Sequence, residues 1–312
     1  MGINLEATTE IQDLVSLRDF VRWGATRFSQ AKIYFGHGTD NAFDEALALV
    51  CHVLALPPVL PDGYIDCRLT LTEKKAIAAL FSERIDTRKP AAYLIGRAWF
   101  AGMPFHVDER VLIPRSPLAE PILQGFTPWL ESERVERILD LCTGSGCIAI
   151  ACAHAFENAS VHAADLSADA LQVVQQNIQL HELDDWVTPI ESDLFDNLAD
   201  FRYQLIISNP PYVSASEMQA LPQEYRHEPS LGLQAEDEGL EIVIRILQQA
   251  SDYLDDDGLL VVEVGNSQEA LEERFPDVPF VWLDFENGGH GVFLLEAAQV
   301  KHYRPAFLAV TE

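Results

Sequence analysis

The sequence predicts an α/β fold: a mostly parallel β-sheet with helices on both faces, preceded by a small helical domain and a β-hairpin. Up to residue 92, apolar residues recur at steps of three or four, as in amphipathic helices. Beyond residue 115, short apolar runs alternate with helical segments, as in parallel sheets that are buried on both faces. We therefore expect a helical domain over 1–92, a hairpin linker over 93–115 and an α/β domain over 116–312.

The helical domain is expected to contain three main helices. The first should begin at a capping box formed by Thr9 and Gln12. A second helix is expected over 40–56, and a third should begin at Thr70 or Thr72. None of these segments carries a chemical motif, so we expect this domain to recognise the substrate.

Aromatic and β-branched residues over 93–115, with a turn at Gly102, predict the hairpin. The strands of the α/β domain are expected around 137–142, 160–166, 187–194, 203–209, 258–265, 278–285 and 290–296. The last two are joined by the turn "ENGG", so the last strand should be antiparallel to its neighbours.

The composition fits a globular protein and excludes several classes. The chain is 48% hydrophobic and 22% charged. No apolar run approaches the ~18 residues of a membrane-spanning helix, and the N-terminus lacks the pattern of a signal peptide. The five cysteines form no CxxC pair, and no His/Cys cluster has the spacing of metal ligands. We expect a cytoplasmic protein with reduced thiols, no metal and no membrane partner.

The charge is strongly acidic. Lys and Arg number 21 against 49 Asp and Glu, which gives a formal net charge of -28. A protein that binds nucleic acid directly usually presents a basic surface to the phosphates. We therefore expect no direct nucleic-acid partner, and we expect electrostatic attraction to a basic protein.

A glycine-rich loop, "DLCTGSGCIAIA", follows the first expected strand of the α/β domain. Residues 144–149 match the dinucleotide pattern G-x-G-x-x-A, and Asp165 follows at the distance expected for a ribose ligand, which would suit a nicotinamide enzyme. Alternatively, Asp140 at the start of the loop suits a donor with a cationic amino-acid end, such as S-adenosylmethionine. Asp193 ends the third strand, where it would meet an adenine amino group or cap the next helix.

The stretch "LIISNPPYVS" ends the fourth strand in two prolines. The Asn209 side chain and the Pro210 backbone each offer a carbonyl oxygen, and two such acceptors hold an NH2 group. The prolines fix the backbone and remove a competing donor. Tyr212 can lie over a planar group. The segment therefore predicts methyl transfer to a planar nitrogen at the switch point of the sheet.

Together these motifs resemble the glutamine-specific class I methyltransferases related to HemK. The resemblance covers nearly the whole chain and rests on "VLIPRSPLAE", "LDLCTGSGCIAIA", "ADLSADAL", "SDLF", "SNPPYV" and "EYRHEP". The segment Arg115–Pro117 is similar to the branch that modifies ribosomal protein L-three of the large subunit. The branch that modifies release factors typically carries Arg-Pro-Glu-Thr-Glu there, and an aromatic residue where Leu194 stands.

The resemblance implies a Rossmann-like sheet of seven strands with the last one antiparallel. It implies S-adenosyl-L-methionine as donor, S-adenosyl-L-homocysteine as product, and a glutamine side-chain amide of L-three as acceptor. The donor would contact Cys142, Thr143, Gly144, Ser145 and Gly146 through its methionine part, Asp165 through its ribose, Asp193 and Leu194 through its adenine, and also Asp140 and Asn209. The acceptor would be bound by Asn209, Pro210, Pro211 and Tyr212, of which Asn209, Pro210 and Tyr212 form the catalytic set.

We expect direct in-line transfer, because no Cys, His or Lys of the motif is placed as a covalent relay. His227 of "EYRHEP" is a candidate proton acceptor. Other functions remain open: a glutamine methyltransferase of release factors, or a nucleic-acid amine methyltransferase, which the acidic charge disfavours. A nicotinamide oxidoreductase leaves the NPPY segment unexplained, and a non-catalytic binding module has no need of both acids and that segment together.

Overall fold

The computed structural model describes residues 10–61, 63–198 and 201–310. The chain forms two compact units. The first takes the residues up to Arg97 together with Pro222–His227, and the second takes Ala98–Leu221 and the residues from Glu228 onward. The chain therefore leaves the second unit for a short segment, which belongs to the helical unit, and then returns. Within the described ranges, no helix is both long and apolar enough to cross a bilayer.

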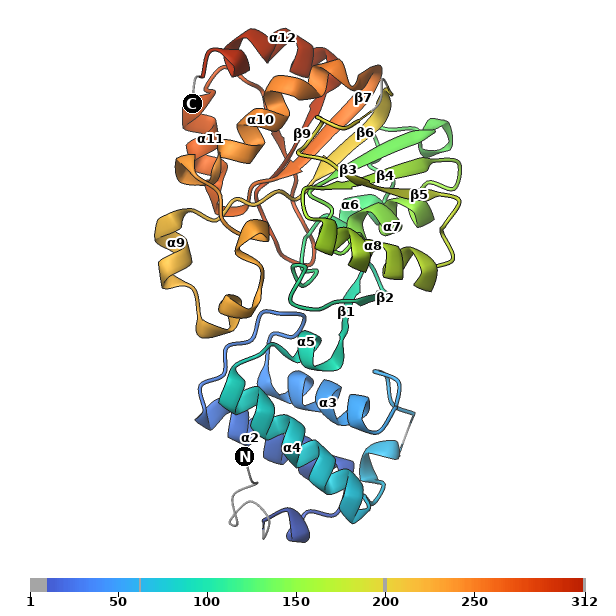
Figure 1. Cartoon of the computed structure of the whole chain (residues 1–312), viewed down its shortest axis with the longest axis vertical. Coiled ribbons are helices and arrows are strands. Elements are labelled where there is room, and N and C mark those ends of the chain that lie inside the picture. The colour runs from blue at the N-terminus through green and yellow to red at the C-terminus, as the bar shows by residue number, and fades with distance from the viewer. Residues whose placement is uncertain (1–9, 62, 199–200, 311–312) are drawn as a thin grey trace. The chain divides into compact units, whose positions relative to one another are not determined.

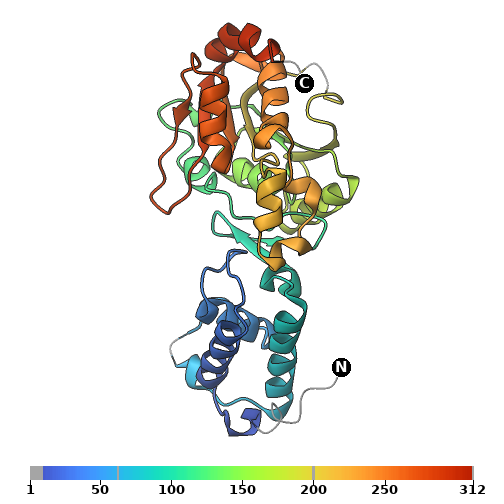
Figure 2. The ribbon, with the colours of Figure 1, turned by 90° about the vertical axis from the view of Figure 1, so that its left-hand side faces the viewer.

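The first unit is helical. It contains α2 (Leu17–Gln30), α3 (Ala42–Val53), α4 (Leu71–Thr87) and α5 (Ala91–Ile95), which pack around an aromatic core (Figure 2). Phe20, Phe28 and Phe81 are fully or almost fully buried in this core. Asn41 caps α3, and Thr70, one of the two expected starts of the third helix, caps α4 in a capping box with Glu73.

The expected first helix is interrupted at residues 14–16. Helix α2 begins at Leu17, and its capping box is formed by Ser16 and Asp19; Thr9 lies outside the described residues. The Asp19 carboxylate accepts hydrogen bonds from the backbone N–H groups of Val15 and Ser16, at 2.8 and 2.9 Å. These bonds stabilise a new helix start at Ser16, so residues 10–13 form a separate helical turn.

The second unit is built on a seven-stranded sheet, as predicted (Figure 1). The strand order is β5-β4-β3-β6-β7-β9-β8. The strands are β3 (Arg137–Leu141), β4 (Ser160–Asp165), β5 (Val187–Glu191), β6 (Tyr203–Ser208), β7 (Leu254–Glu263), β8 (Val281–Trp282) and β9 (Val292–Glu296). Strand β9 pairs antiparallel with β7 and β8, which confirms the expected antiparallel last strand. A separate two-stranded hairpin, β1 (Arg97–Phe100) and β2 (Met103–His106), turns at Gly102.

Helices cover both faces of the sheet (Figures 1 and 2). Helices α6 (Ala119–Leu123), α7 (Cys147–Ala155) and α8 (Ala168–Leu180) contribute to the core on one face. Helices α10 (Glu241–Gln249), α11 (Gln268–Arg274) and α12 (Ala297–Leu308) contribute to the core on the other, and α9 (Ala215–Ala220) follows the NPPY segment. Strand β3 pairs in parallel with β4 on one side and β6 on the other, so the strand order reverses there. Ligands bind at such a switch point, at the carboxyl ends of the strands.

Candidate active site

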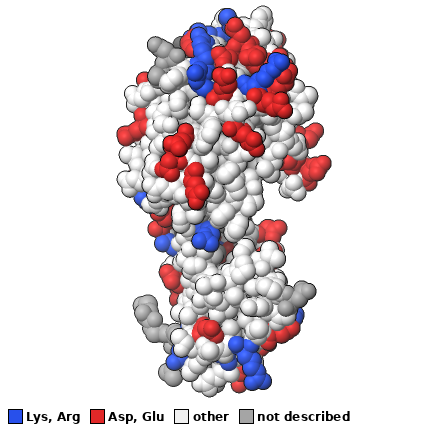
Figure 3. All heavy atoms as spheres, turned by 90° about the vertical axis from the view of Figure 1, so that its right-hand side faces the viewer, with Lys and Arg blue, Asp and Glu red and all other residues white. Residues whose placement is uncertain are grey.

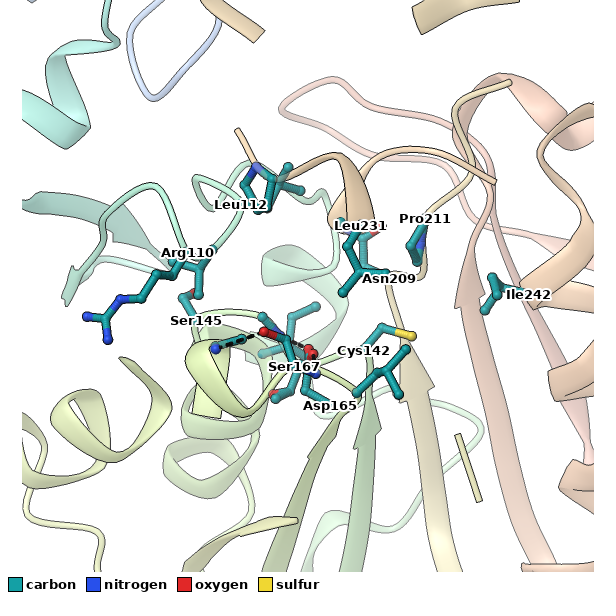
Figure 4. A pocket seen from close by; sticks show the side chains of 18 of the residues that line it. Arg110, Leu112, Cys142, Ser145, Asp165, Ser167, Asn209, Pro211, Leu231 and Ile242 are labelled. Carbon is teal, nitrogen blue, oxygen red and sulfur yellow. Dashed lines mark hydrogen bonds between the residues drawn. The ribbon is translucent and has the colours of Figure 1, made fainter. Parts of the chain in front are cut away.

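A cavity of about 350 Å³ opens in the second unit at the carboxyl ends of β3, β4, β5 and β6 (Figure 4). Its wall is formed by residues from Arg110–Ser116, Cys142–Ile148, Asp165–Ala170, Ser192–Leu194, Asn209, Pro211, Pro229–Gln234 and Glu241–Arg245. The glycine loop, the acids after β4 and β5, and part of the NPPY segment therefore share one cavity.

The glycine loop makes a tight turn between β3 and α7. Cys142, Gly144 and Gly146 have φ values of 57°, 56° and 79°, in the left-handed region that favours glycine. A Cβ on Gly144 would meet no atom within 4 Å, so this glycine leaves open space beside the cavity. A Cβ on Gly146 would lie 3.0 Å from Cγ1 of Val174, so this glycine allows α7 to approach α8. The loop thus leaves room for a ligand while it packs closely underneath.

Asp140 lies fully buried below the loop rather than in the cavity wall. Its Oδ2 accepts hydrogen bonds from the Thr143 hydroxyl at 2.5 Å and from the backbone N–H of Ala149 at 3.0 Å. Its Oδ1 has no hydrogen-bond partner among the described residues. Burial raises the pKa of Asp140 to about 7, against the two hydrogen bonds that favour its charged form. A buried, unpaired carboxylate oxygen is a group that a bound cation would complete.

Asp165 ends β4 and lies in the cavity wall (Figure 4). Its Oδ2 accepts from the backbone N–H of Gly144 at 2.9 Å, and its Oδ1 accepts from that of Ser167 at 2.8 Å. Burial raises the pKa of this carboxyl, and the backbone hydrogen bonds oppose the shift. Each oxygen keeps a further lone pair, so Asp165 shapes the glycine loop and can still accept ligand hydroxyls.

Asp193 also lines the cavity, and it is paired with a residue that the sequence motifs do not indicate. Its Oδ1 lies 2.9 Å from Nη2 of Arg245, which comes from α10 and lines the same cavity. The hydrogen bond from Arg245 holds this carboxylate and raises the pKa of the guanidinium. Leu194, beside it, is buried and has a left-handed φ of 49°. A single arginine in the apolar run "EIVIRIL" was the available signal, but nothing in the sequence pairs it with Asp193.

The NPPY segment is divided between the cavity and the core. Asn209 and Pro211 line the cavity, while the described cavity wall does not include Pro210 or Tyr212 (Figure 4). The hydroxyl of Tyr212 donates to Oε1 of Glu263 at 2.8 Å. A Cβ on Gly265 would lie 2.5 Å from the Tyr212 ring, so the ring packs closely against the end of β7. The structure therefore places this ring beside the cavity, where it supports the turn that carries Asn209.

The segment after the hairpin forms another part of the wall. Arg115 makes a bidentate pair with Glu228 of the "EYRHEP" motif, at 2.6 and 2.8 Å, and Glu228 also accepts from the backbone N–H of Ile113 at 3.0 Å. Both motifs are visible in the sequence, but their pairing is not. His227, next to Glu228 in the chain, belongs to the helical unit, where its Nε2 lies 2.9 Å from the carbonyl oxygen of Thr87.

Comparisons with known proteins agree with this geometry. The family described as methyltransferase small domain matches residues 125–224. A ribosomal protein uL3 glutamine methyltransferase of Francisella tularensis subsp. tularensis is 46% identical over 298 residues, which are 95% of each chain. A protein of the same name from Xylella fastidiosa is 50% identical over 294 residues, which are 94% of each chain.

Among solved structures, the hMettl16 catalytic domain in complex with an RNA hairpin is 18% identical, with a TM-score of 0.47 over 73% of this chain and 81% of that one. This likeness is too weak to carry an argument about function. The two relatives match almost the full length of the chain at a much higher identity. The chain belongs to the family of ribosomal protein uL3 glutamine methyltransferases.

Proposed function

We propose that this protein transfers a methyl group from S-adenosylmethionine to the side-chain amide nitrogen of a glutamine in ribosomal protein uL3. The observation that carries the proposal is the shared cavity: Asn209 lies in the same wall as the glycine loop, Asp165 and Asp193. A donor site and an amide-binding group that open into one cavity allow transfer between their two ligands. The relatives' names supply the acceptor protein.

The residues present fit this donor. The unpaired Oδ1 of Asp140 supports a cationic ligand near the glycine loop, and Asp165 has lone pairs for ribose hydroxyls. Arg245 occupies one oxygen of Asp193, so the other oxygen remains for an adenine amino group. When bound, the donor supplies an electrophilic methyl group attached to a sulfonium.

The protein's part in the transfer is to orient the amide. An amide nitrogen is a poor nucleophile because its lone pair is delocalised into the carbonyl. The Asn209 side-chain oxygen, in the cavity wall, would accept one N–H bond of the amide. The sequence motif assigns the other to the carbonyl of Pro210, which is buried next to Asn209 in the chain. Two such bonds would hold the nitrogen and favour a more pyramidal geometry. Orientation of two reactants in near-attack geometry contributes roughly 7 to 11 kcal/mol to a reaction of this kind.

The cysteines of the cavity support direct transfer rather than a covalent relay. Burial, with the nearby Asp165 and Asp140 carboxyls, raises the pKa of the Cys142 thiol far above its usual value. Burial also raises the pKa of Cys147 to about 12. Both thiols therefore stay protonated near neutral pH, and a protonated thiol is a weak nucleophile.

The charge of the molecule supports a basic acceptor. The net charge is -28, and acidic side chains are spread over the visible face of the second unit (Figure 3). Ribosomal proteins are basic because they bind rRNA, so long-range attraction raises the rate of encounter. We assign recognition of the acceptor protein to the helical unit, and we place the reaction in the cytoplasm, where ribosomal proteins are made.

A methyl-transfer assay with radiolabelled donor tests the proposal. Purified uL3, release factors and ribosomal RNA are offered separately, and the labelled residue is identified by mass spectrometry. We expect label on a glutamine of uL3. Label on release factors alone, on RNA alone, or on no substrate would overturn the proposed function.

A further inference from the structure

Glu263 makes contacts that the proposed reaction leaves unexplained. It is the last residue of β7 and is 4% exposed. Its Oε1 accepts a hydrogen bond from the Tyr212 hydroxyl at 2.8 Å, and its Oε2 accepts one from the Ser116 hydroxyl at 2.5 Å. One carboxylate thus joins the NPPY segment to the segment that follows the hairpin.

The backbone around Tyr212 leaves its ring little freedom. Gly265 has a left-handed φ of 49°, and a Cβ there would lie 2.5 Å from ring atom Cε2 of Tyr212. A Cβ on Gly239 would lie 2.1 Å from the Tyr212 carbonyl oxygen, which also accepts a hydrogen bond from the Ser267 hydroxyl at 3.2 Å. Gly265 therefore packs closely against the ring of Tyr212 and Gly239 against its backbone, and the ring hydroxyl donates to Glu263.

The Ser116 side chain is also held in place, by two hydrogen bonds. Its Oγ donates to Glu263 and accepts from the backbone N–H of Leu118 at 3.1 Å. Ser116 and its neighbour Arg115 both lie in the cavity wall. Glu263 therefore holds the wall residue Ser116 directly. It also holds Tyr212, whose neighbour in the chain, Pro211, lies in the wall.

If the only role of residue 263 were to fill space, a carboxylate would be an unfavourable choice, because burial of a charged group costs free energy. Burial raises the pKa of Glu263, against the hydrogen bonds from Ser116 and Tyr212, which shows that the protein environment disfavours its charge. An apolar side chain of similar volume often stabilises such a position as well or better. The carboxylate differs from it in one respect: it accepts two hydrogen bonds in fixed directions.

We propose that Glu263 is a positioning residue for the methyl acceptor. Its carboxylate holds Tyr212 and Ser116, so that the parts of the cavity wall that carry Asn209 and Arg115 keep a fixed spacing. The inference rests on the proposed function. Glu263 acts through its two partners and does not touch the reacting atoms. Loss of the two hydrogen bonds that Glu263 accepts from Tyr212 and Ser116 should loosen the acceptor side of the cavity. The donor side, at the glycine loop, should stay intact.

A double-mutant cycle of Glu263→Gln and Tyr212→Phe tests this. Each single variant should lower kcat/KM for uL3 by at least about tenfold, because the acceptor is held less well in the transition state. The double variant should lose little more than the worse single variant, because Tyr212→Phe removes the same hydrogen bond that Glu263→Gln weakens by taking the charge from its acceptor. The affinity for S-adenosylmethionine, measured by calorimetry, should stay within about twofold of the wild type.

Further variants separate positioning from stability. Glu263→Met keeps the volume but accepts no hydrogen bond in this geometry, so it should fold and be slow. Ser116→Ala removes the second hydrogen bond to Glu263, and it serves as the test if a Glu263 variant fails to fold. Tyr253→Phe is a matched control, since its hydroxyl donates to the Phe195 carbonyl at 3.3 Å and it does not line the cavity.

The outcomes are distinct. A folded Glu263→Met with full activity on uL3, or single-variant losses that multiply in the double variant, would overturn the inference. A Tyr253→Phe variant as slow as Tyr212→Phe would also overturn it, because any lost hydroxyl would then have the same effect. If the wild-type protein methylates no glutamine of uL3, the proposed function fails, whatever the variants do.

Discussion

At the scale of single residues, Asp140 links the donor site to pH. Burial raises its pKa to about 7, so near neutral pH its carboxyl is protonated in part of the molecules. A cationic donor favours the ionised form, because an opposite charge stabilises a carboxylate. Donor affinity should therefore increase as pH rises from about 6 to about 7.5, by at most about tenfold per pH unit for one proton. This window lies below the pH at which the donor's own amino group loses its proton, about 7.7 to 8.0.

Asp140→Asn should remove this pH dependence. Calorimetric titration with S-adenosylmethionine across the window measures it in both proteins. Asp165 also has a raised pKa, and its contribution remains in the variant, so the difference between the two curves belongs to Asp140. Asp277→Asn, at an exposed position, is the control. Equal slopes for wild type and Asp140→Asn would show that this carboxyl does not face the cationic part of the donor.

A variant of Asn209 should separate acceptor binding from donor binding. It lies in the cavity wall just after β6, whose end is tied to β3 by a 2.8 Å hydrogen bond from the Ser208 hydroxyl to the Leu141 carbonyl. Asn209→Ala removes one of two acceptors for the amide NH2 but leaves this strand end in place. Methyl transfer to uL3 should be abolished, while donor affinity stays within about tenfold.

Single-turnover methyl transfer and calorimetry measure the two effects of Asn209→Ala. Asn158→Ala, an exposed position where the amide bonds to the Glu133 carbonyl, is the matched control. Turnover near the wild-type rate in Asn209→Ala would remove this residue from the acceptor site.

At the scale of secondary-structure elements, the sheet strands were predictable, but the break before α2 was not. The apolar runs of β3, β4, β6 and β7 are buried on both faces, so their sequences differ clearly from the amphipathic helices between them. At the N-terminus two Ser/Thr positions, Thr9 and Ser16, each have a polar residue three positions later. Local sequence therefore does not show that the helical pattern is interrupted before Leu17, because the break depends on how α2 packs into the core.

The site was predictable where a motif carries its own geometry. The glycine loop and Asn209 are local patterns at strand ends, and parallel pairing of β3 with β6 brings them together. The pairs Arg245–Asp193 and Glu263–Tyr212 were not predictable, because their members are 52 and 51 residues apart in the chain. An arginine in a helix and a glutamate at a strand end are ordinary surface residues by pattern, and only the fold brings each of them to its partner.

The segment Pro222–His227 is a further element that only the fold explains. Glu224 is buried in the helical unit, where it accepts from the backbone N–H of Tyr34 at 3.1 Å. Its Oε1 also lies 3.7 Å from Arg84 and 3.5 Å from Arg88. Arg84 is fully buried and bonds to Glu45 at 2.8 Å. These charges form one buried network that binds the segment to α3 and α4.

Glu224→Ala should destabilise this unit. Removing one partner leaves Arg84 and Arg88 less well compensated in a buried site, and such a loss typically costs about 3 to 5 kcal/mol. Urea unfolding, followed by hydrogen exchange of the backbone amides in α3 and α4, measures the change in the helical unit. Glu236→Ala, at an exposed position, should change stability little. A Glu224→Ala protein as stable as the wild type would show that the segment is not held by this network.

At the scale of the whole molecule, the proposed function divides chemistry and recognition between parts of the chain. Every residue in the wall of the described cavity belongs to the second unit, and the helical unit contributes none. In the proposed function the cavity binds an amide, which all glutamine and asparagine side chains share. Choice of one protein therefore requires contacts outside the cavity, and the net charge of -28 makes a basic protein the favoured partner.

This division predicts a salt dependence that belongs to the protein substrate alone. Raising salt from about 50 to about 300 mM shortens the Debye length from about 14 to about 6 Å, which screens the attraction between an acidic enzyme and a basic acceptor. The value of kcat/KM for uL3 should fall several-fold, about fivefold or more, mainly through slower association. A short uncharged peptide that contains the same glutamine should react with little dependence on salt, because it has no charge to attract. Both substrates are compared at saturating donor, and donor affinity is measured at each salt concentration to correct for any change at the donor site. If uL3 and the peptide respond equally, the acidic surface serves solubility rather than recognition, and the selectivity for uL3 must come from short-range contacts.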